Sequence, residues 1–169
     1  MTFLGIDGGG SKTAFLLETD AGQELARLET GPSNWLSSGS STARESITAG
    51  ITRLPTMPDV VCGGFAGAGR PEGIEFYRTC LAALLPKAQV IVETDAFITF
   101  IGAIGLKPGV LLIAGTGSIA ATANFYERGE RIRAVETMST FSRESASSPR
   151  IAVLIAGKGA SWLRRNKLR

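Results

Sequence analysis

The feature that most constrains the fold is an internal repeat, which relates the first 30 residues to a segment much further along the chain. Residues 3–30 align without gaps on residues 110–137. Both segments have the pattern of a strand, a glycine-rich turn, a second strand, a polar turn and a third strand. The matching turns predict a duplicated lobe with two glycine turns that face each other across a cleft, and the alternative is a coincidence between two glycine-rich hairpins. Nine of the 28 aligned positions are identical to the residue 107 positions later: Leu4, Ile6, Gly8, Gly10, Ser11, Ala14, Gly22, Glu29 and Thr30.

The segments between the two copies alternate between strand and helix patterns. Short apolar runs predict strands, and longer segments with helical apolar spacing predict helices. The resulting order, βββαβαβα, is that of an α/β ribonuclease-H-like lobe, the building block of actin-like ATPases. Continuous apolar runs also predict parallel strands that are buried on both faces. The strands are expected at 2–7, 13–19, 23–30, 59–62, 88–93 and 109–114, and the helices at 41–54, 72–85 and 94–105.

The turn between the first two strands has the composition of a phosphate-binding site. Residues 7–13 read DGGGSKT. Successive glycines let backbone N–H groups approach an anion, and the hydroxyl and ammonium side chains add further donors. Asp7, at the end of the first strand, is placed to hold Mg²⁺ through water. The turn is neither a Walker loop nor a dinucleotide-binding turn, and the alternative is a glycine-rich hairpin with a solvated aspartate. The predicted phosphate ligands are Gly8, Gly9, Gly10, Ser11, Lys12 and Thr13.

The second copy of the repeat has a glycine turn of its own. Its position in the repeat predicts a second phosphate-binding turn with amide and hydroxyl donors. Ala114 stands where Asp7 stands in the first copy, so only one lobe keeps the metal-binding carboxylate. That difference suits a single Mg²⁺ in the cleft. The predicted ligands of the second turn are Gly115, Thr116, Gly117 and Ser118.

Asp95 lies where a predicted strand meets a predicted helix, in the segment ETDAF. Ligands bind at the carboxyl ends of such strands. A carboxylate there can accept a proton from a substrate hydroxyl during phosphoryl transfer. It can equally cap the helix, and Thr94 is an alternative cap. The chemistry of the residues alone leaves both roles open.

Five motifs resemble those of N-acetylglucosamine kinases and of the wider BadF/BadG/BcrA/BcrD ATPase family. In chain order they are FLGIDGGGSKT, GPSNW, FAGAGRPEG, ETDAF and LLIAGTGS, and they cover about residues 2–136. The resemblance implies an ATP-dependent kinase that phosphorylates a hydroxyl of an amino sugar or a similar hexose. ATP and Mg²⁺ are then the expected cofactors, and a small sugar is the expected substrate.

The resemblance also implies roles for single residues. In similar kinases the aspartate of the DA motif is the catalytic base and contacts the substrate, which points to Asp95. The asparagine of the GPSNW motif contacts the sugar, which points to Asn34 with Trp35 as a neighbouring wall. The GTG turn lies beside both the sugar and the phosphate, which points to Thr116 and Gly117 as substrate-binding residues.

The resemblance stops after the second hairpin. Similar kinases continue with GGWG and GDEGS segments and with a lobe that holds adenosine, whereas residues 134–150 read AVETMSTFSRESASSPR. Residues 138–169 hold seven Lys and Arg against one acid, Glu144, which gives a net charge of +6. We therefore expect residues 1–107 to form the first lobe, 108–137 to begin a second lobe, and 138–169 to be a basic, Ser-rich tail that is non-native or disordered. The chain is expected to be a truncated or frame-shifted kinase.

Composition limits the alternatives. The absence of histidine excludes Ser-His-Asp and Cys-His catalysis. Cys62 and Cys80 lack CxxC spacing and are expected to be buried free thiols. The sequence has no apolar run of membrane-spanning length and no basic region before an apolar N-terminal stretch, which predicts a cytoplasmic protein.

Two further functions remain open. One is a BadF-type ATPase that activates a partner enzyme through an iron–sulfur cluster held by paired cysteines. The other is a non-catalytic kinase remnant that binds phosphate. We keep a homodimer as an alternative to a monomer, and we expect neither a membrane partner nor a nucleic-acid partner, because no aromatic platform accompanies the basic tail.

Overall fold

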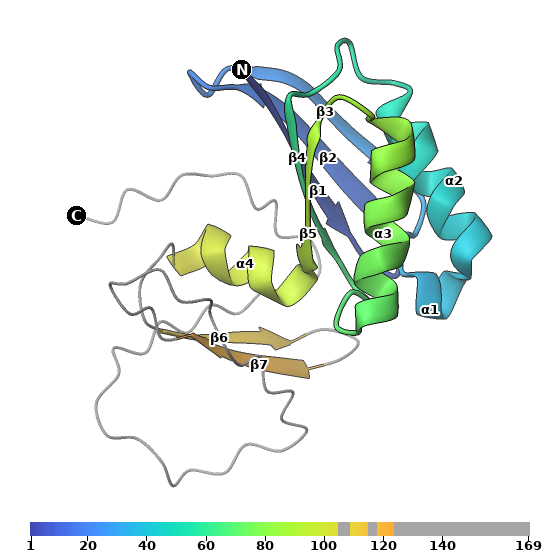
Figure 1. Cartoon of the computed structure of the whole chain (residues 1–169). Helices are drawn as coiled ribbons and strands as arrows, with labels where there is room; N and C mark the ends of the chain where they lie inside the picture. Colours follow the sequence, from blue (N-terminus) through green and yellow to red (C-terminus); the bar gives the residue numbers. More distant parts are fainter. Residues whose placement is uncertain (105–108, 115–117, 124–169) are drawn as a thin grey trace, which may run out of the picture. The chain divides into compact units, whose positions relative to one another are not determined.

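The computed structural model describes residues 1–104, 109–114 and 118–123 (Figure 1). The chain divides into two compact units, Met1–Ile98 and Thr99–Arg169, and each is described by itself. The division falls within the last helix of the first lobe, before the boundary at residue 107 that the sequence predicts. No helix in these described ranges is long and apolar enough to cross a membrane.

Five strands form a mixed sheet in the first unit, in the order β3-β2-β1-β4-β5. The first three strands pair antiparallel, whereas β1, β4 and β5 pair parallel. The carboxyl ends of these three parallel strands therefore meet at one edge, where Gly8, Phe65 and Thr94 align in register. The strands are β1 (Thr2–Gly8), β2 (Thr13–Thr19), β3 (Glu24–Thr30), β4 (Val60–Phe65) and β5 (Gln89–Thr94).

The helices of the described residues are α1 (Trp35–Ser38), α2 (Ser40–Ile51), α3 (Pro71–Leu84) and α4 (Asp95–Ile104). Helices α2 and α3 lie side by side against one face of the sheet (Figure 1). Pro71 begins α3 in the first turn, where its missing N–H breaks no helical hydrogen bond. The buried residues of α2 recur at spacings of three and four, which places them on the side that faces the sheet: Ala43, Ser46, Ile47, Gly50 and Ile51.

The element order agrees with the predicted βββαβαβα order, and three details differ. The sequence does not predict α1, whose four residues are too few to show a helical period. The helix predicted at 41–54 ends at Ile51. Strand β4 continues through Gly63 and Gly64 to Phe65, where the sequence predicts a glycine-rich loop. These glycines serve close packing, because a Cβ at Gly64 would collide with Ile98.

The hydrophobic core lies between the sheet and the two helices α2 and α3. Burial alternates along β1, so that Leu4 and Ile6 are buried while Phe3 is 40% exposed. The prediction that the strands are buried on both faces is therefore wrong for β1, because α2 and α3 cover only the core-facing side of that strand. The largest fully buried side chains include Tyr77, Phe15, Phe65, Leu4, Ile6, Leu17, Ile47, Leu81 and Val61.

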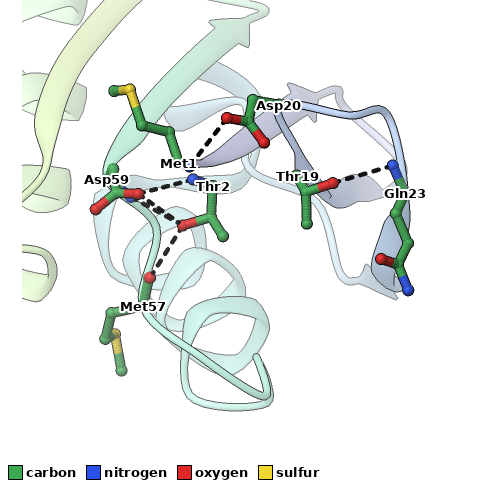
Figure 2. A network of polar contacts seen from close by, with 7 residues as sticks. All are labelled: Met1, Thr2, Thr19, Asp20, Gln23, Met57 and Asp59. Carbon is green, nitrogen blue, oxygen red and sulfur yellow. Dashed lines mark hydrogen bonds and ion pairs between the residues drawn. The ribbon is translucent and has the colours of Figure 1, made fainter.

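A polar network fixes the start of β1 at the end of the sheet opposite the glycine turn (Figure 2). The Asp59 carboxylate accepts hydrogen bonds from the Thr2 backbone N–H at 2.7 Å and from the Thr2 hydroxyl at 3.3 Å. The Asp59 N–H in turn donates to the Thr2 carbonyl at 3.0 Å. Because Asp59 directly precedes β4, these bonds set the parallel register of β1 and β4. That register in turn aligns the strand ends at the opposite edge.

A second antiparallel hairpin consists of β6 (Gly109–Ala114) and β7 (Ser118–Ala123). The repeat predicts this succession of strand, turn and strand. The pairing register differs, however, because Asp7 pairs with Ala14 whereas its counterpart Ala114 pairs with Ser118. The two turns are thus not equivalent in length. The third strand of the repeat at 130–137 and the tail at 138–169 lie outside the described residues.

Candidate active site

The glycine turn between β1 and β2 surrounds an open depression of about 200 Å³. The Gly9 N–H donates a hydrogen bond to the Lys12 carbonyl at 2.9 Å and so closes the turn. Gly10, Ser11 and Lys12 are exposed to solvent. Four of the six predicted phosphate ligands of this turn therefore line one accessible space. Its lining consists of Asp7, Gly9, Gly10, Ser11, Lys12 and Ala14.

Gly8 and Thr13, the other two predicted phosphate ligands of this turn, lie on the core side. Thr13 is fully buried, and its hydroxyl is within 2.8 Å of both the Gly31 carbonyl oxygen and the Ser33 hydroxyl. A Cβ at Gly8 would lie 2.5 Å from the Ser33 Oγ and would collide with the Phe65 ring. Gly8 and Thr13 thus pack beneath the turn and do not line the depression. The sequence could not show this, because it does not reveal which side of the turn each residue faces.

Lys12 has a partner that sequence reasoning missed. Its ammonium group forms an ion pair with the Glu29 carboxylate of β3, and both side chains are more than half exposed. Exposed ion pairs contribute about 0–1 kcal/mol, because water and salt screen them. The Lys12 ammonium group can therefore turn toward an anion in the depression at little energetic cost.

Asp7 is an exposed carboxylate at the edge of this depression. Loss of hydration raises the pKa of Asp7 above its ordinary value, the Asp95 charge raises it further, and Lys12 lowers it. The folded state therefore holds the Asp7 proton more tightly than the unfolded chain does. Protonation of Asp7 therefore stabilises the folded state relative to the unfolded chain. This contribution is present at acidic pH and is lost as the pH rises through the folded pKa, and it is small because the side chain is exposed. Pairs of carboxylates in which one raises the pKa of the other, as Asp95 does for Asp7, are frequent at functional sites.

Asp95 begins α4 at the carboxyl end of β5, on the sheet edge that also holds the end of β1. The Thr94 hydroxyl accepts a hydrogen bond from the Phe97 N–H at 3.1 Å, which is the geometry of a helix cap. Asp95 Oδ1 accepts the Ala96 N–H at 2.8 Å, and within the described ranges no hydrogen bond involves Oδ2. Strand β5 is two strands from β1, so the two strand ends are roughly 10 Å apart.

The segment that contains Asn34 and Trp35 is attached directly to the glycine turn. The Gly9 carbonyl accepts hydrogen bonds from the backbone N–H of Ser33 at 3.0 Å and of Asn34 at 3.1 Å. The Asn34 side-chain oxygen caps α1 by accepting the Leu36 N–H at 3.1 Å. The Asn34 amide nitrogen is thus the part of this side chain that remains for a ligand. Trp35 donates its indole N–H to the Gly67 carbonyl at 3.0 Å.

One residue beside the predicted sugar contacts has no role that the sequence predicts. Tyr77 of α3 hydrogen-bonds to the segment that contains Asn34 and Trp35. A buried tyrosine usually needs a polar partner for its hydroxyl, and this is the signal that could have found Tyr77.

The second phosphate-binding turn stays a prediction. Ser118 begins β7, whereas Gly115, Thr116 and Gly117 lie outside the described residues.

Comparison with known proteins identifies the family. The family model of the BadF/BadG/BcrA/BcrD ATPases matches residues 4–140. The chain belongs to the BadF/BadG/BcrA/BcrD ATPase family. The chain is 34% identical over 135 residues to the N-acetylmuramic acid/N-acetylglucosamine kinase of Clostridium acetobutylicum, and the match covers 76% of this chain and 44% of the relative. The N-acetyl-D-glucosamine kinase of Dictyostelium discoideum is 31% identical and covers 72% of this chain and 43% of the relative.

Solved structures support the same fold for this family member. A ROK family glucokinase from Streptomyces griseus, in complex with glucose and AMPPNP, matches with a TM-score of 0.58 at 18% identity. The match covers 79% of this chain and 46% of the glucokinase. The first unit is thus confirmed as an α/β lobe of the actin-like ATPase type. The chain spans less than half the length of the curated relatives that it matches.

Proposed function

We propose that this lobe serves ATP-dependent phosphorylation of an acetamido sugar hydroxyl. The observation that supports this proposal most is that three features lie together at one edge of the sheet. The glycine turn lies after β1, Asp95 lies after β5, and the loop of Asn34 and Trp35 is bonded to the turn. The relatives named for N-acetylglucosamine and N-acetylmuramic acid provide the substrate class.

In this proposal the turn holds phosphate oxygens. Gly10, Ser11 and Lys12 line the open depression. Their proposed phosphate donors are the backbone N–H groups of Gly10 and Ser11, the Ser11 hydroxyl and the Lys12 ammonium group. Such donors stabilise the charge of a triphosphate without a change in the backbone, because the turn is already closed by the bond from Gly9 to Lys12. Gly115, Thr116, Gly117 and Ser118 would supply further donors from the second turn.

Asp95 is the proposed proton acceptor. The sugar hydroxyl oxygen forms a bond to the γ-phosphorus, the bond from that phosphorus to the bridging oxygen breaks, and ADP leaves with the electron pair. The hydroxyl proton passes to a carboxylate oxygen of Asp95. The cap role that competes with this assignment is already filled by Thr94. Such a reaction depends mainly on positioning and charge stabilisation.

A magnesium ion fits the residues beside the turn. Mg²⁺ keeps several waters and usually binds one or two carboxylates together with substrate phosphates. Asp7 offers one such carboxylate, and the described residues contain no cluster of three Asp, Glu, Cys or His that would build a full protein cage. The pKa of Asp7 is raised mainly by loss of hydration and then by the Asp95 charge, and a cation beside Asp7 would offset both effects. When bound, the ion would neutralise charge on the phosphates.

Asn34 and Trp35 are the proposed sugar contacts. Asn34 uses its oxygen to cap α1, which leaves its amide N–H groups to donate to a sugar hydroxyl or acetamido oxygen. Trp35 is partly buried and stacks on Phe76 with ring centroids 5.8 Å apart. A fixed aromatic ring is suited to cover the apolar face of a sugar ring. Thr116 and Gly117, which lie outside the described residues, stay predicted sugar contacts.

The alternative of an iron–sulfur activator gains no support from the described residues. Cys80 belongs to the core under α3, whereas Cys62 lies on β4 at a position that alternates away from that core. Both cysteines are free thiols. Burial raises the pKa of each thiol above its ordinary value, and a raised pKa opposes the thiolate that a cluster needs.

Product analysis tests the proposed reaction. The protein is incubated with Mg²⁺, ATP and N-acetylglucosamine, N-acetylmuramic acid or glucose in parallel, and the products are identified by mass spectrometry. We expect a sugar monophosphate and ADP in equal amounts with an acetamido sugar. Hydrolysis of ATP to ADP and free phosphate, without any phosphorylated sugar, would contradict the proposed transfer and favour a plain ATPase.

A further inference from the structure

The Tyr77 hydroxyl is a buried polar group that connects three segments of the chain. Tyr77 lies on α3 and is fully buried, and its ring stacks on Phe65 with centroids 4.0 Å apart. The hydroxyl accepts the Trp35 backbone N–H at 3.1 Å. It lies 2.7 Å from the Ser33 carbonyl and 3.0 Å from the Ala66 carbonyl, so its single proton serves one or both of these acceptors.

The two loops that the Tyr77 hydroxyl joins to α3 are both hydrogen-bonded to the glycine turn. The Gly9 carbonyl accepts the Ser33 and Asn34 N–H groups, and the Gly8 carbonyl accepts the Ala66 N–H at 2.8 Å. The Trp35 indole N–H joins the two loops directly by donating to the Gly67 carbonyl at 3.0 Å. Tyr77 is thus a side chain of helix α3 that hydrogen-bonds to both of the loops around the turn.

We infer that Tyr77 is a positioning residue for the sugar, which sets the place of Asn34 and Trp35 relative to the phosphate-binding turn. This inference rests on the proposed function. Asn34 lies between Ser33 and Trp35, the two residues that the hydroxyl bonds directly. A displacement of either neighbour therefore moves the amide group of Asn34. The phosphate-binding turn is closed by its own bond from Gly9 to Lys12 and does not need the hydroxyl.

The hydroxyl remains protonated under all ordinary conditions. Burial raises the pKa of Tyr77 to about 12, against a small opposing effect of the bond from the Trp35 N–H, and the Asp95 charge raises it slightly. The proton that serves the Ser33 and Ala66 carbonyls is therefore present throughout the physiological pH range. Sugar binding should not depend on the titration of this residue.

Replacement of Tyr77 by phenylalanine tests the inference. Tyr77→Phe keeps the ring that packs on Phe65 and removes only the oxygen, so the Trp35 N–H and the Ser33 carbonyl lose their shared partner. Titration calorimetry then measures the binding of N-acetylglucosamine and, separately, of ADP with Mg²⁺. We expect sugar binding to weaken by about tenfold, whereas the dissociation constant for ADP with Mg²⁺ should stay within a factor of two.

Thr79→Val is the matched control. It removes a hydroxyl from the same helix, but this hydroxyl is exposed and donates to Glu75 on the same helix, at 3.2 Å. Wild-type sugar binding by Tyr77→Phe would overturn the inference, and so would an equal loss for sugar and nucleotide, which would mean a general structural role. A wild-type protein that binds ADP but no sugar would contradict the proposed sugar kinase itself and the inference with it.

Discussion

Replacement of Asp95 by asparagine should lower sugar phosphorylation by about 10²–10⁴-fold, which is the usual contribution of a general base. Asparagine keeps the size of the side chain and one acceptor oxygen, but it cannot take a proton from the sugar hydroxyl. The dissociation constant for the sugar should change by less than about threefold, since the hydrogen bond from Ala96 can be kept by the amide oxygen. Steady-state turnover and sugar binding, measured on the same samples, separate the two effects.

Thr94→Ala provides the control for this prediction. The Thr94 hydroxyl caps α4 through the Phe97 N–H, so its loss should cost about 1 kcal/mol in the free energy of unfolding. It should leave turnover nearly unchanged. If Asp95→Asn retained wild-type turnover, Asp95 would not be the proton acceptor. A helix-cap role alone predicts that both stability and turnover survive in Asp95→Asn, because asparagine caps a helix about as well as aspartate.

Replacement of Gly8 by alanine should lower the free energy of unfolding of the first unit by about 3 kcal/mol, which is the upper end of the usual cost of overpacking a core. The new Cβ would lie 2.5 Å from the Ser33 Oγ and would collide with the Phe65 ring. Both neighbours are buried and fixed, because Ser33 bonds to Thr13 and Phe65 stacks on Tyr77. Relief of the collision therefore requires a shift of the strand or of the loop. Urea unfolding followed by circular dichroism measures the change.

Gly5→Ala on the same strand is the matched control. Its Cβ would be 3.9 Å from the nearest atom, the Leu16 carbonyl oxygen, which is an ordinary contact. Alanine in place of glycine also lowers the entropy of the unfolded chain, so this variant should be as stable as the wild type or slightly more so. Equal stability of Gly8→Ala and Gly5→Ala would contradict the close packing of Gly8 against Ser33 and Phe65.

Much of the fold could be predicted from the sequence because local patterns decide it. The hairpin of β1 and β2 follows from two apolar runs on either side of a run of glycines, and β2 has the predicted bounds, 13–19. The extent of strand β4 does not follow from local pattern, since Gly63 and Gly64 are typical of a loop. They belong to the strand because Phe65 and Ile98 fill the space beside them. Which face of β1 is covered also depends on tertiary packing and not on its apolar run.

The site shows the same division between local and tertiary information. The exposed Ser11 and Lys12 could be recognised from the motif, whereas the inward direction of Thr13 depends on Gly31 and Ser33, which are 18 and 20 residues away. The hydrogen bonds of Tyr77 join it to residues 42 and 44 positions earlier. No periodic pattern in a sequence can reveal bonds of that separation.

The central claim is that the first glycine turn binds nucleotide phosphates, and calorimetric titration with ADP tests it most directly. Gly10→Val fills the depression, yet its Cβ would be 3.8 Å from the nearest atom, the Ser37 Oγ, so the fold should remain intact. Gly5→Val on β1 serves as the control. We expect Mg²⁺-dependent binding by the wild type and by Gly5→Val, at least tenfold weaker binding by Gly10→Val, and loss of the Mg²⁺ dependence in Asp7→Asn. Equal affinity of the wild type and Gly10→Val for ADP with Mg²⁺ would contradict the claim.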